Sequence, residues 1–217
     1  MKSLLIDTCT DHGIVAIAVD GRLLQVNALP AGNRCSQFLM PTIDRLLSQL
    51  KLNVNSISYL VVAVGPGSYT GIRVGVAAAK AMSFAAEIPI VSVSTFEGYR
   101  SLKEDPFMPM IDARSGGIYC WVHNEAKLVP IENVPALLDG IKTIVSPDCE
   151  KIKERLAPLC PVDAYEWEDV WPSAAALSQV GFERYLRHQY TFKGEVNILY
   201  LRETQAESEL KLKKEQK

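Results

Sequence analysis

The turn Gly65–Ser68 is the most distinctive polar segment of the sequence, and its spacing could serve phosphate chemistry. It follows the apolar run 60–64, which predicts a buried strand, and precedes the small-residue segment 71–86, which predicts a helix. Backbone amides at such a helix start can hold an anion, and Ser68 or Thr70 can cap them. The turn lacks the Lys-Ser/Thr of a P-loop and the spacing of a dinucleotide-binding motif. Close packing of the helix on the strand is therefore an equal alternative. The candidate anion contacts are Gly65, Gly67 and Ser68.

A second candidate site centres on Asp7, which ends the apolar run 3–7 and precedes two threonines. A carboxylate beside hydroxyls can face a phosphate or a bound Mg²⁺. Asp112 ends a later apolar run in the same way, so the two aspartates could flank a cleft for Mg-ATP. A stand-alone kinase-like ATPase is therefore the alternative function for this chain. On these residues alone, we prefer the simpler interpretation that Asp7 ends a strand and organises the following turn.

Other catalytic patterns are missing from the sequence. The three histidines, His12, His123 and His188, are isolated and have no metal-ligand spacing. The five cysteines are far apart and form no C-x-x-C pair, which favours reduced, structural thiols. No nucleophile elbow is present. The carboxylates of a Trp-containing segment are expected to lie in a solvated loop: Glu166, Glu168 and Asp169.

Length and composition predict a soluble globular protein with one large domain or two small ones. The chain has 217 residues, of which 48% are hydrophobic, and a formal net charge of -2. This charge provides no bulk attraction to RNA or anionic lipid. The first residues do not continue as an apolar signal sequence, and no segment reaches the length of a membrane span. We expect a cytoplasmic protein without membrane contact.

Strands and helices alternate along the chain, which predicts an α/β fold. The expected strands are 3–7, 14–19, 23–29, 60–64, 89–93, 108–113, 118–123 and 141–146. The expected helices are 33–50, 71–86, 95–103, 149–159 and 173–187, with Ser36 as a candidate cap of the first. Asp20-Gly21 predicts a hairpin turn, and 197–202 is expected to be extended.

The opening pattern of the chain recurs after the charged, proline-containing run 102–109. A strand that ends in aspartate, a turn and a return strand are expected both at the N-terminus and from residue 108 onward. This recurrence indicates an internal duplication. We predict an N-terminal lobe at 1–104, a smaller C-terminal lobe at 105–202, and a charged tail at 203–217 that could be helical.

Several stretches of the sequence match the motifs of one family. They begin at Ile6 (IDTCTDHGIVAIAVDG), Cys35 (CSQFLMPTIDRLL), Val62 (VAVGPGSYTGIR and the helix after it), Met110 (MIDARSGGIYCWV) and Asn197 (NILYLR). Together they resemble the TsaB family, also called YeaZ. The segment GPGSYTGIR is shared with the catalytic sister family TsaD, whereas the Asp-Ala-Arg and Tyr-Leu-Arg segments point to TsaB. The resemblance implies a duplicated actin/Hsp70/sugar-kinase-like (ASKHA) fold with a reduced second lobe.

The resemblance also implies a non-catalytic scaffold subunit of the machinery that makes threonylcarbamoyladenosine (t6A) next to the anticodon in tRNA. In the catalytic sister family, two histidines four residues apart hold the active-site metal. The matching positions here are Thr95 and Tyr99, and neither hydroxyl is a usual ligand for a soft divalent metal. A metal site is therefore not expected. No cofactor is expected either, with ATP or ADP only at an interface shared with the catalytic subunit.

By the same resemblance, this subunit binds and activates a TsaD-type catalytic subunit through the helices at 34–50 and 71–86. Small residues in the second helix permit the close approach of another helix. Helical phase gives the expected partner-facing set: Met40, Asp44, Arg73, Ala77, Lys80 and Phe84. A TsaE-type ATPase is expected to join through the complex and tRNA to be contacted indirectly. The isolated chain is expected to form a homodimer through the same apolar surface.

Overall fold

The computed structural model describes residues 1–30, 35–103, 105–192 and 195–201, and the predicted tail at 203–217 lies outside them. The strands are β1 (Lys2–Asp7), β2 (Ile14–Val19), β3 (Arg22–Ala28), β4 (Tyr59–Ala63), β5 (Ile90–Val93), β6 (Phe107–Asp112), β7 (Ile118–Val122), β8 (Glu125–Val129), β9 (Thr143–Ser146) and β10 (Glu166–Asp169). The α-helices are α1 (Cys35–Gln49), α2 (Tyr69–Ala86), α3 (Cys149–Leu156) and α4 (Ala174–Leu186). The short 3-10 helices are η1 (Val54–Ser56), η2 (Thr95–Gly98), η3 (Arg114–Gly116), η4 (Ile131–Asn133), η5 (Pro135–Leu137) and η6 (Val162–Ala164).

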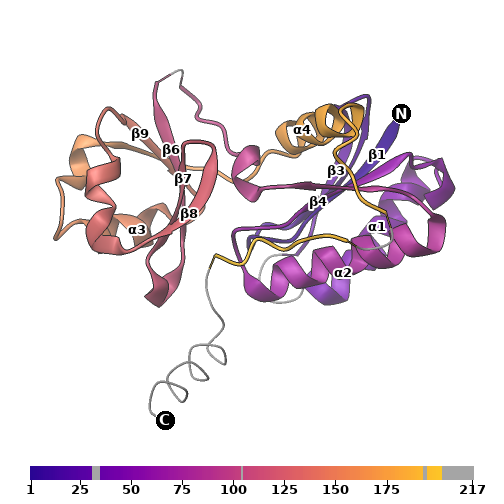
Figure 1. The fold of residues 1–217 in the computed structure, drawn as a ribbon, viewed down its shortest axis with the longest axis horizontal. Helices are drawn as coiled ribbons and strands as arrows, with labels where there is room; N and C mark the ends of the chain where they lie inside the picture. The colour runs from indigo at the N-terminus through magenta and orange to yellow at the C-terminus, as the bar shows by residue number, and fades with distance from the viewer. Residues whose placement is uncertain (31–34, 104, 193–194, 202–217) are drawn as a thin grey trace, which may run out of the picture.

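The described strands form two sheets with the same order and directions (Figure 1). The first sheet has the order β3-β2-β1-β4-β5, and the second has the order β8-β7-β6-β9-β10. The leading strand of each sheet is antiparallel to its hairpin partner and parallel to the strand on its other side. This repeated topology confirms the predicted internal duplication and the two-lobed α/β fold.

The second lobe is the reduced copy. α1 connects β3 to β4 in the first lobe, whereas only the 3-10 helices η4 and η5 lie between β8 and β9 in the second. The following helix is also shorter in the second lobe: α2 has 18 residues, and its counterpart α3 has 8. The larger apolar core consequently lies in the first lobe.

Helices cover both faces of the first sheet (Figure 1). α1 and α2 lie on one face, and α4 returns from the C-terminal part of the chain to pack on the other. β4 is buried along its whole length as a result. Gly181 allows this close approach, because a Cβ there would lie 2.5 Å from a methyl group of Val61. The three-part division at 104/105 and 202/203 stays a prediction, and it assigns α4 to the second lobe although α4 packs on the first sheet.

A separate apolar cluster joins the two lobes. Phe96 and Tyr99, from η2 and the residue after it, contact Ile111, Tyr119 and Val145 of the second sheet. All five side chains are at least nine-tenths buried. η2 therefore acts as a wedge that connects the first lobe to the inner face of the second sheet.

The structure confirms the predicted hairpin turn at Asp20-Gly21 and the predicted helix cap at Ser68. Asp20 and Gly21 have φ angles of 50° and 77°, as the tight β2–β3 hairpin requires. Ser68 caps α2, because its side chain accepts a hydrogen bond from the Gly71 amide at 3.3 Å. Ser173 caps α4 in the same way.

Several local predictions are wrong. The helix expected at 95–103 is only the turn η2. Ser94 and Glu97 form a capping box at its start, but Tyr99 already has extended backbone angles (φ -77°, ψ 140°), and Arg100 donates to the carbonyl groups of Glu97 and Tyr99. Ser36 lies inside α1 and does not cap it.

The carboxylates expected in a solvated loop lie in a strand instead. Glu166 and Glu168 belong to β10, which pairs with β9 in parallel. Glu166 forms an ion pair with Lys103, and Glu168 accepts a hydrogen bond from the Leu102 amide at 2.8 Å. β8, a strand of alternating charged and apolar residues, was not predicted either.

Candidate functional site

The glycine turn is held by bonds within the chain. The Ser68 amide donates to the Cys9 carbonyl oxygen at 2.7 Å, and the Ser68 hydroxyl oxygen accepts from the Gly71 amide. Gly65 has a φ of 106°, which disfavours a residue with a side chain. At the helix start where an anion was predicted to bind, the amide and the hydroxyl of Ser68 are therefore already hydrogen-bonded within the chain.

The loop after β1 packs directly on the start of α2. A Cβ at Gly67 would lie 2.1 Å from the Cys9 carbonyl oxygen, and one at Gly71 would lie 2.0 Å from the Thr8 carbonyl oxygen. The Thr8 hydroxyl donates to the Gly71 carbonyl oxygen at 2.6 Å. This geometry agrees with the packing alternative for the glycines. A role of Gly65, Gly67 and Ser68 in binding an anion stays a prediction.

Asp7 lies at the junction of the lobes and is 1% exposed. Its carboxylate accepts a hydrogen bond from the Cys9 amide at 2.8 Å, as expected for a residue that organises a turn. Burial raises the pKa of this carboxyl group, and the hydrogen bonds from Cys9 oppose that shift. A role of Asp7 in contacting a nucleotide also stays a prediction.

Thr95 and Tyr99, the two positions at which the family resemblance predicts no metal ligand, are the first residue of η2 and the residue just after it. Thr95 is fully buried and Tyr99 is 1% exposed. The Tyr99 hydroxyl lacks a hydrogen-bond partner among the described residues, whereas the Thr95 hydroxyl lies beside the Cys9 thiol. Burial raises the pKa of Tyr99 well above its ordinary value, with a further contribution from the carboxylate of Asp7. The segment 95–99 thus fills the lobe junction with a buried ring and buried hydroxyls.

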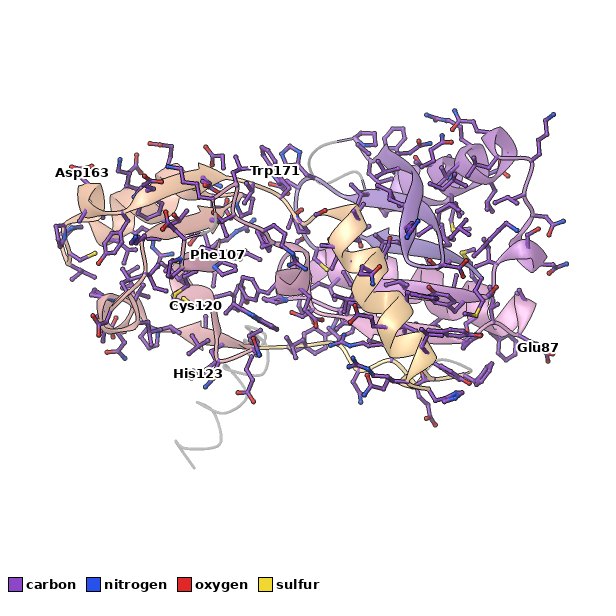
Figure 2. The ribbon with its side chains drawn as sticks, turned by 90° about the horizontal axis from the view of Figure 1, so that it is seen from above. Glu87, Phe107, Cys120, His123, Asp163 and Trp171 are labelled. Carbon is purple, nitrogen blue, oxygen red and sulfur yellow. The ribbon has the colours of Figure 1, made fainter. Side chains whose placement is uncertain are left out.

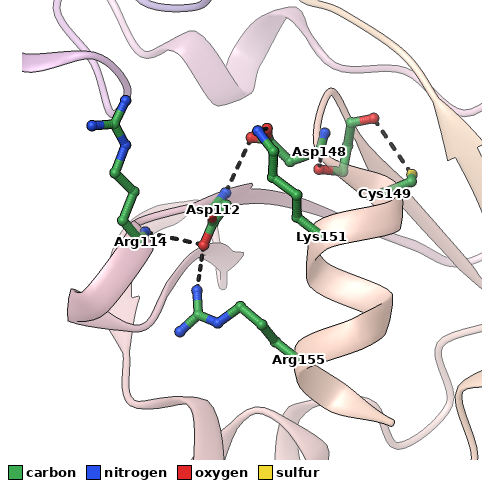
Figure 3. Close-up of polar contacts among 7 residues, drawn as sticks. Asp112, Arg114, Asp148, Cys149, Lys151 and Arg155 are labelled. Carbon is green, nitrogen blue, oxygen red and sulfur yellow. Dashed lines mark hydrogen bonds and ion pairs between the residues drawn. The ribbon is translucent and has the colours of Figure 1, made fainter.

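Asp112, the counterpart of Asp7 in the second lobe, is tied into a network of its own (Figure 3). It forms an ion pair with Arg155 of α3 and accepts a hydrogen bond from the Arg114 amide at 3.0 Å. Its own amide donates to Asp148, which pairs with Lys151 at 3.1 Å. Sequence analysis predicted the position of Asp112 but not its cationic partner, because Arg155 is 43 residues away along the chain.

The six predicted partner-facing residues lie on α1 and α2, which pack against each other. Met40 is 51% exposed and Phe84 is 73% exposed. Asp44, Arg73 and Ala77 are exposed, and Lys80 is half-buried. The structure therefore places the whole set on one pair of helices and leaves its apolar members uncovered by the described residues. Their role as an interface stays a prediction.

Sequence analysis missed a strap that crosses the start of α2. The segment 195–201 runs back over the first lobe beside α2 (Figure 1), and the Leu199 amide donates to the Val64 carbonyl oxygen at 3.0 Å. Arg73 lies over the ring of Tyr69, 4.0 Å from its centroid, and its Nε donates to the Tyr200 hydroxyl at 2.9 Å. Arg73 is therefore exposed but held by two tyrosines.

The remaining candidates are structural. Cys9, Cys120 and Cys149 are buried free thiols, and Cys160 is a half-buried one. His12 is exposed and its ring contacts that of Trp171, with centroids 4.2 Å apart and planes inclined by 50°. Within the described ranges, no group of three or more His, Cys, Asp or Glu side chains is arranged to hold a metal ion. None of the described helices is long and apolar enough to cross a membrane.

The duplicated lobes and the glycine-packed turn define a two-lobed α/β protein whose two sheets share one topology. The family model described as "TsaD: tRNA N6-adenosine threonylcarbamoyltransferase" matches residues 30–143. Within this group, the chain belongs to the TsaB/YeaZ family. This assignment confirms the resemblance drawn from the sequence.

Curated relatives support the assignment, and a solved structure shows the shared fold. The "tRNA threonylcarbamoyladenosine biosynthesis protein TsaB" of Bacillus subtilis is 33% identical over 117 residues, which is 50% of this chain and 51% of the relative. Its counterpart from Haemophilus influenzae is 30% identical over 121 residues, 54% of this chain and 51% of the relative. The chain thus spans about half the length of these relatives. A structure of "YeaZ from Pseudomonas aeruginosa" covers 92% of this chain and 99% of its own, with a TM-score of 0.73 and 23% identity, which shows the shared fold.

Proposed function

We propose that this chain is a non-catalytic subunit that binds and activates a TsaD-type catalytic subunit for threonylcarbamoylation of adenosine next to the anticodon in tRNA. Membership of the TsaB/YeaZ family supports a role in t6A biosynthesis, because curated relatives carry that description. The exposed face of α2 supports a role as a binding subunit. A cytoplasmic location is part of the same proposal.

The observation that carries the proposal is the uncovered small-residue face of α2. Ala77, Ala81 and Ala85 are exposed along a helix whose opposite side is buried, and Phe84 stands among them with 73% exposure. Alanines on a helix surface allow the backbone of another helix to approach closely, and a large exposed aromatic side chain is typical of an interface. Met40 of the neighbouring α1 extends the apolar surface.

The state of the lobe junction supports the non-catalytic part of the proposal. Thr95 and Tyr99 are buried in the wedge between the lobes and present no imidazole to a metal. Asp112 is already paired with Arg155, so it is poorly placed to bind Mg²⁺. Asp7 is nearly inaccessible. The burial of Asp7 and the pairing of Asp112 favour this proposal over the kinase-like ATPase alternative, which needs both aspartates at an open cleft.

The proposal assigns the other partners around the same face. A TsaE-type ATPase would join through the complex, and tRNA would be contacted indirectly. ATP or ADP would bind only at the interface shared with the catalytic subunit, and the chain would hold no cofactor of its own. In the absence of the catalytic subunit, two copies would cover the exposed apolar face by forming a homodimer.

Substitution of Ala77 by Arg tests the interface. The new side chain would place an unpaired charge in a close-packed contact, which typically costs about 2–4 kcal/mol and thus at least about tenfold in affinity. Calorimetry with the purified TsaD-type subunit measures this loss, and an in vitro tRNA modification assay measures its consequence. Circular dichroism should show unchanged folding, because Ala77 is exposed.

Ala175→Arg is the matched control. Ala175 is an exposed alanine on α4, which lies on the opposite face of the first sheet. The control variant should bind the catalytic subunit as the wild type does. Equal affinity of all three proteins would show that the α2 face is not the interface, and modification at full rate without this subunit would overturn the proposed function.

A further inference from the structure

A crevice of about 460 Å³ lies between the lobes, beside the wedge η2. Its walls include Phe96, Phe107 and Trp121, and two guanidinium groups, from Arg100 and Arg184, reach it. These residues come from η2 and the two residues after it, from α4 and from the β6–β7 hairpin, so the crevice exists only because the two lobes meet. Volume, aromatic lining and position between lobes are those of small-molecule sites in general.

Tyr99 of the lobe junction also lines the crevice, but the crevice lies at the opposite end of β6 from Asp112. Phe107 begins β6 and Asp112 ends it. A strand rises by about 3.3 Å per residue, so the two positions are about 16 Å apart along β6. Figure 2 shows Phe107 on the side of the second lobe that faces the first. A ligand in the crevice would therefore not contact Asp112.

The aromatic walls combine fixed and accessible rings. Phe96 is 2% exposed and is held in the cluster that joins the lobes. Trp121 lies beside it, with ring centroids 5.7 Å apart and planes inclined by 48°. Trp121 and Phe107 are only partly buried, so each retains ring surface for a ligand. A flat aromatic group is the chemistry that such rings recognise best.

The two arginines differ in how many of their N–H groups are already hydrogen-bonded and in whether their charge is paired. Arg184 donates to Glu97 at 2.8 Å and to the Ser92 carbonyl oxygen at 2.6 Å, so its charge is balanced by a carboxylate. Arg100 donates only through Nη1, to the carbonyl groups of Glu97 and Tyr99. Its Nε and Nη2 groups have no partner among the described residues, and it forms no ion pair with any of them. Arg100 thus presents an uncompensated positive charge at the aromatic walls.

We propose that this crevice binds a small molecule that carries a planar aromatic ring and one anionic group. The ring lies against Trp121 and Phe107, and the anion accepts charge-assisted hydrogen bonds from Arg100. A nucleoside monophosphate and an aromatic carboxylate both have this chemistry. The inference does not depend on the interface proposed for α2, because it uses neither α1 nor α2.

Calorimetric titration of the full chain with four probes tests the site. AMP and indole-3-acetate carry both features, adenosine lacks the anion, and inorganic phosphate lacks the ring. Saturable binding of AMP alone would identify a nucleotide site, and of indole-3-acetate alone a site for aromatic carboxylates. Adenosine and phosphate should bind at least about tenfold more weakly than the better probe. The proposal is overturned if neither aromatic anion binds with a Kd below about 1 mM, or if phosphate alone binds as well.

Two variants and a matched control locate the binding. Arg100→Gln should weaken the aromatic anion by about 10- to 100-fold and leave adenosine unchanged, because only the charge contact is lost. Trp121→Leu should weaken the anions and adenosine alike, and it should remove ligand-induced quenching of Trp121 fluorescence. Arg114→Gln, an exposed arginine near the other end of β6, should change nothing. Equal losses in Arg100→Gln and Arg114→Gln would exclude the crevice as the site.

Discussion

The packing of the β1–β2 loop against the start of α2 predicts a large effect for Gly71→Ala. The added Cβ would lie 2.0 Å from the Thr8 carbonyl oxygen, which is backbone and cannot rotate away. Helix and loop must therefore separate by more than 1 Å. That movement would also disturb the buried hydrogen bond from the Thr8 hydroxyl to the Gly71 carbonyl oxygen.

The magnitude follows from three contributions. Overpacking costs about 1–3 kcal/mol, and the disturbed buried hydrogen bond costs about 1–3 kcal/mol. Alanine returns up to about 1 kcal/mol of helix propensity. The expected net loss is about 3 kcal/mol in the free energy of unfolding, which lowers the Tm by about 6–12 °C for a domain of this size.

Chemical denaturation of the purified chain measures this loss, with Gly140→Ala as the control. A Cβ at Gly140 would meet no atom within 4 Å, and its φ of 73° alone should cost about 1–2 kcal/mol. If Gly71→Ala were no less stable than Gly140→Ala, the steric reading of the glycine turn would be refuted. Anion binding would then be the better explanation for the glycines of this turn.

Three further outcomes are expected. Arg155→Met should lower the free energy of unfolding by about 1–3 kcal/mol, since it leaves the largely buried carboxylate of Asp112 unpaired: Asp112 is 12% exposed and Arg155 29% exposed. If the double variant with Asp112→Asn regains stability, the loss is due to the unpaired carboxylate, and if it does not, this explanation is contradicted. Burial raises the pKa of Asp7 above 3.8, so the folded state gains stability relative to Asp7→Asn as the pH falls through the folded-state pKa toward 3.8. Denaturation curves at several pH values measure this gain, and a pH-independent difference would contradict it. Burial raises the pKa of Cys120 and Cys149 to about 12, so a thiol reagent at pH 8 should leave both unmodified in the native chain, as mass spectrometry of labelled peptides can check.

Short-range rules were sufficient for much of the fold. Apolar runs predicted the central strands, Asp20-Gly21 predicted the hairpin, and Ser68 predicted the helix cap. These signals are local, because they depend on backbone angles and on side chains within a few residues. The duplication was also visible in the sequence, since each lobe opens with a strand that ends in aspartate.

Strands β8 and β10 were not predictable in the same way. β8 alternates charged and apolar residues, and β10 has only four residues. Each is stabilised by its pairing with a more apolar neighbouring strand, β7 for β8 and β9 for β10. The helix expected at 95–103 failed for a related reason. Phe96 and Tyr99 are buried between the lobes, and this tertiary contact decides the conformation of the segment.

The sequence by itself determined the two-lobed α/β architecture, the family and the pair of helices proposed as an interface, because these depend on periodicity and motif. Only the tertiary structure decided how the polar candidates are used. It paired Asp112 with Arg155, placed the Thr8 loop against Gly71, and held Arg73 between two tyrosines. It also formed the aromatic crevice around Trp121 from three distant segments. Such contacts join residues tens of positions apart, and no local pattern encodes them.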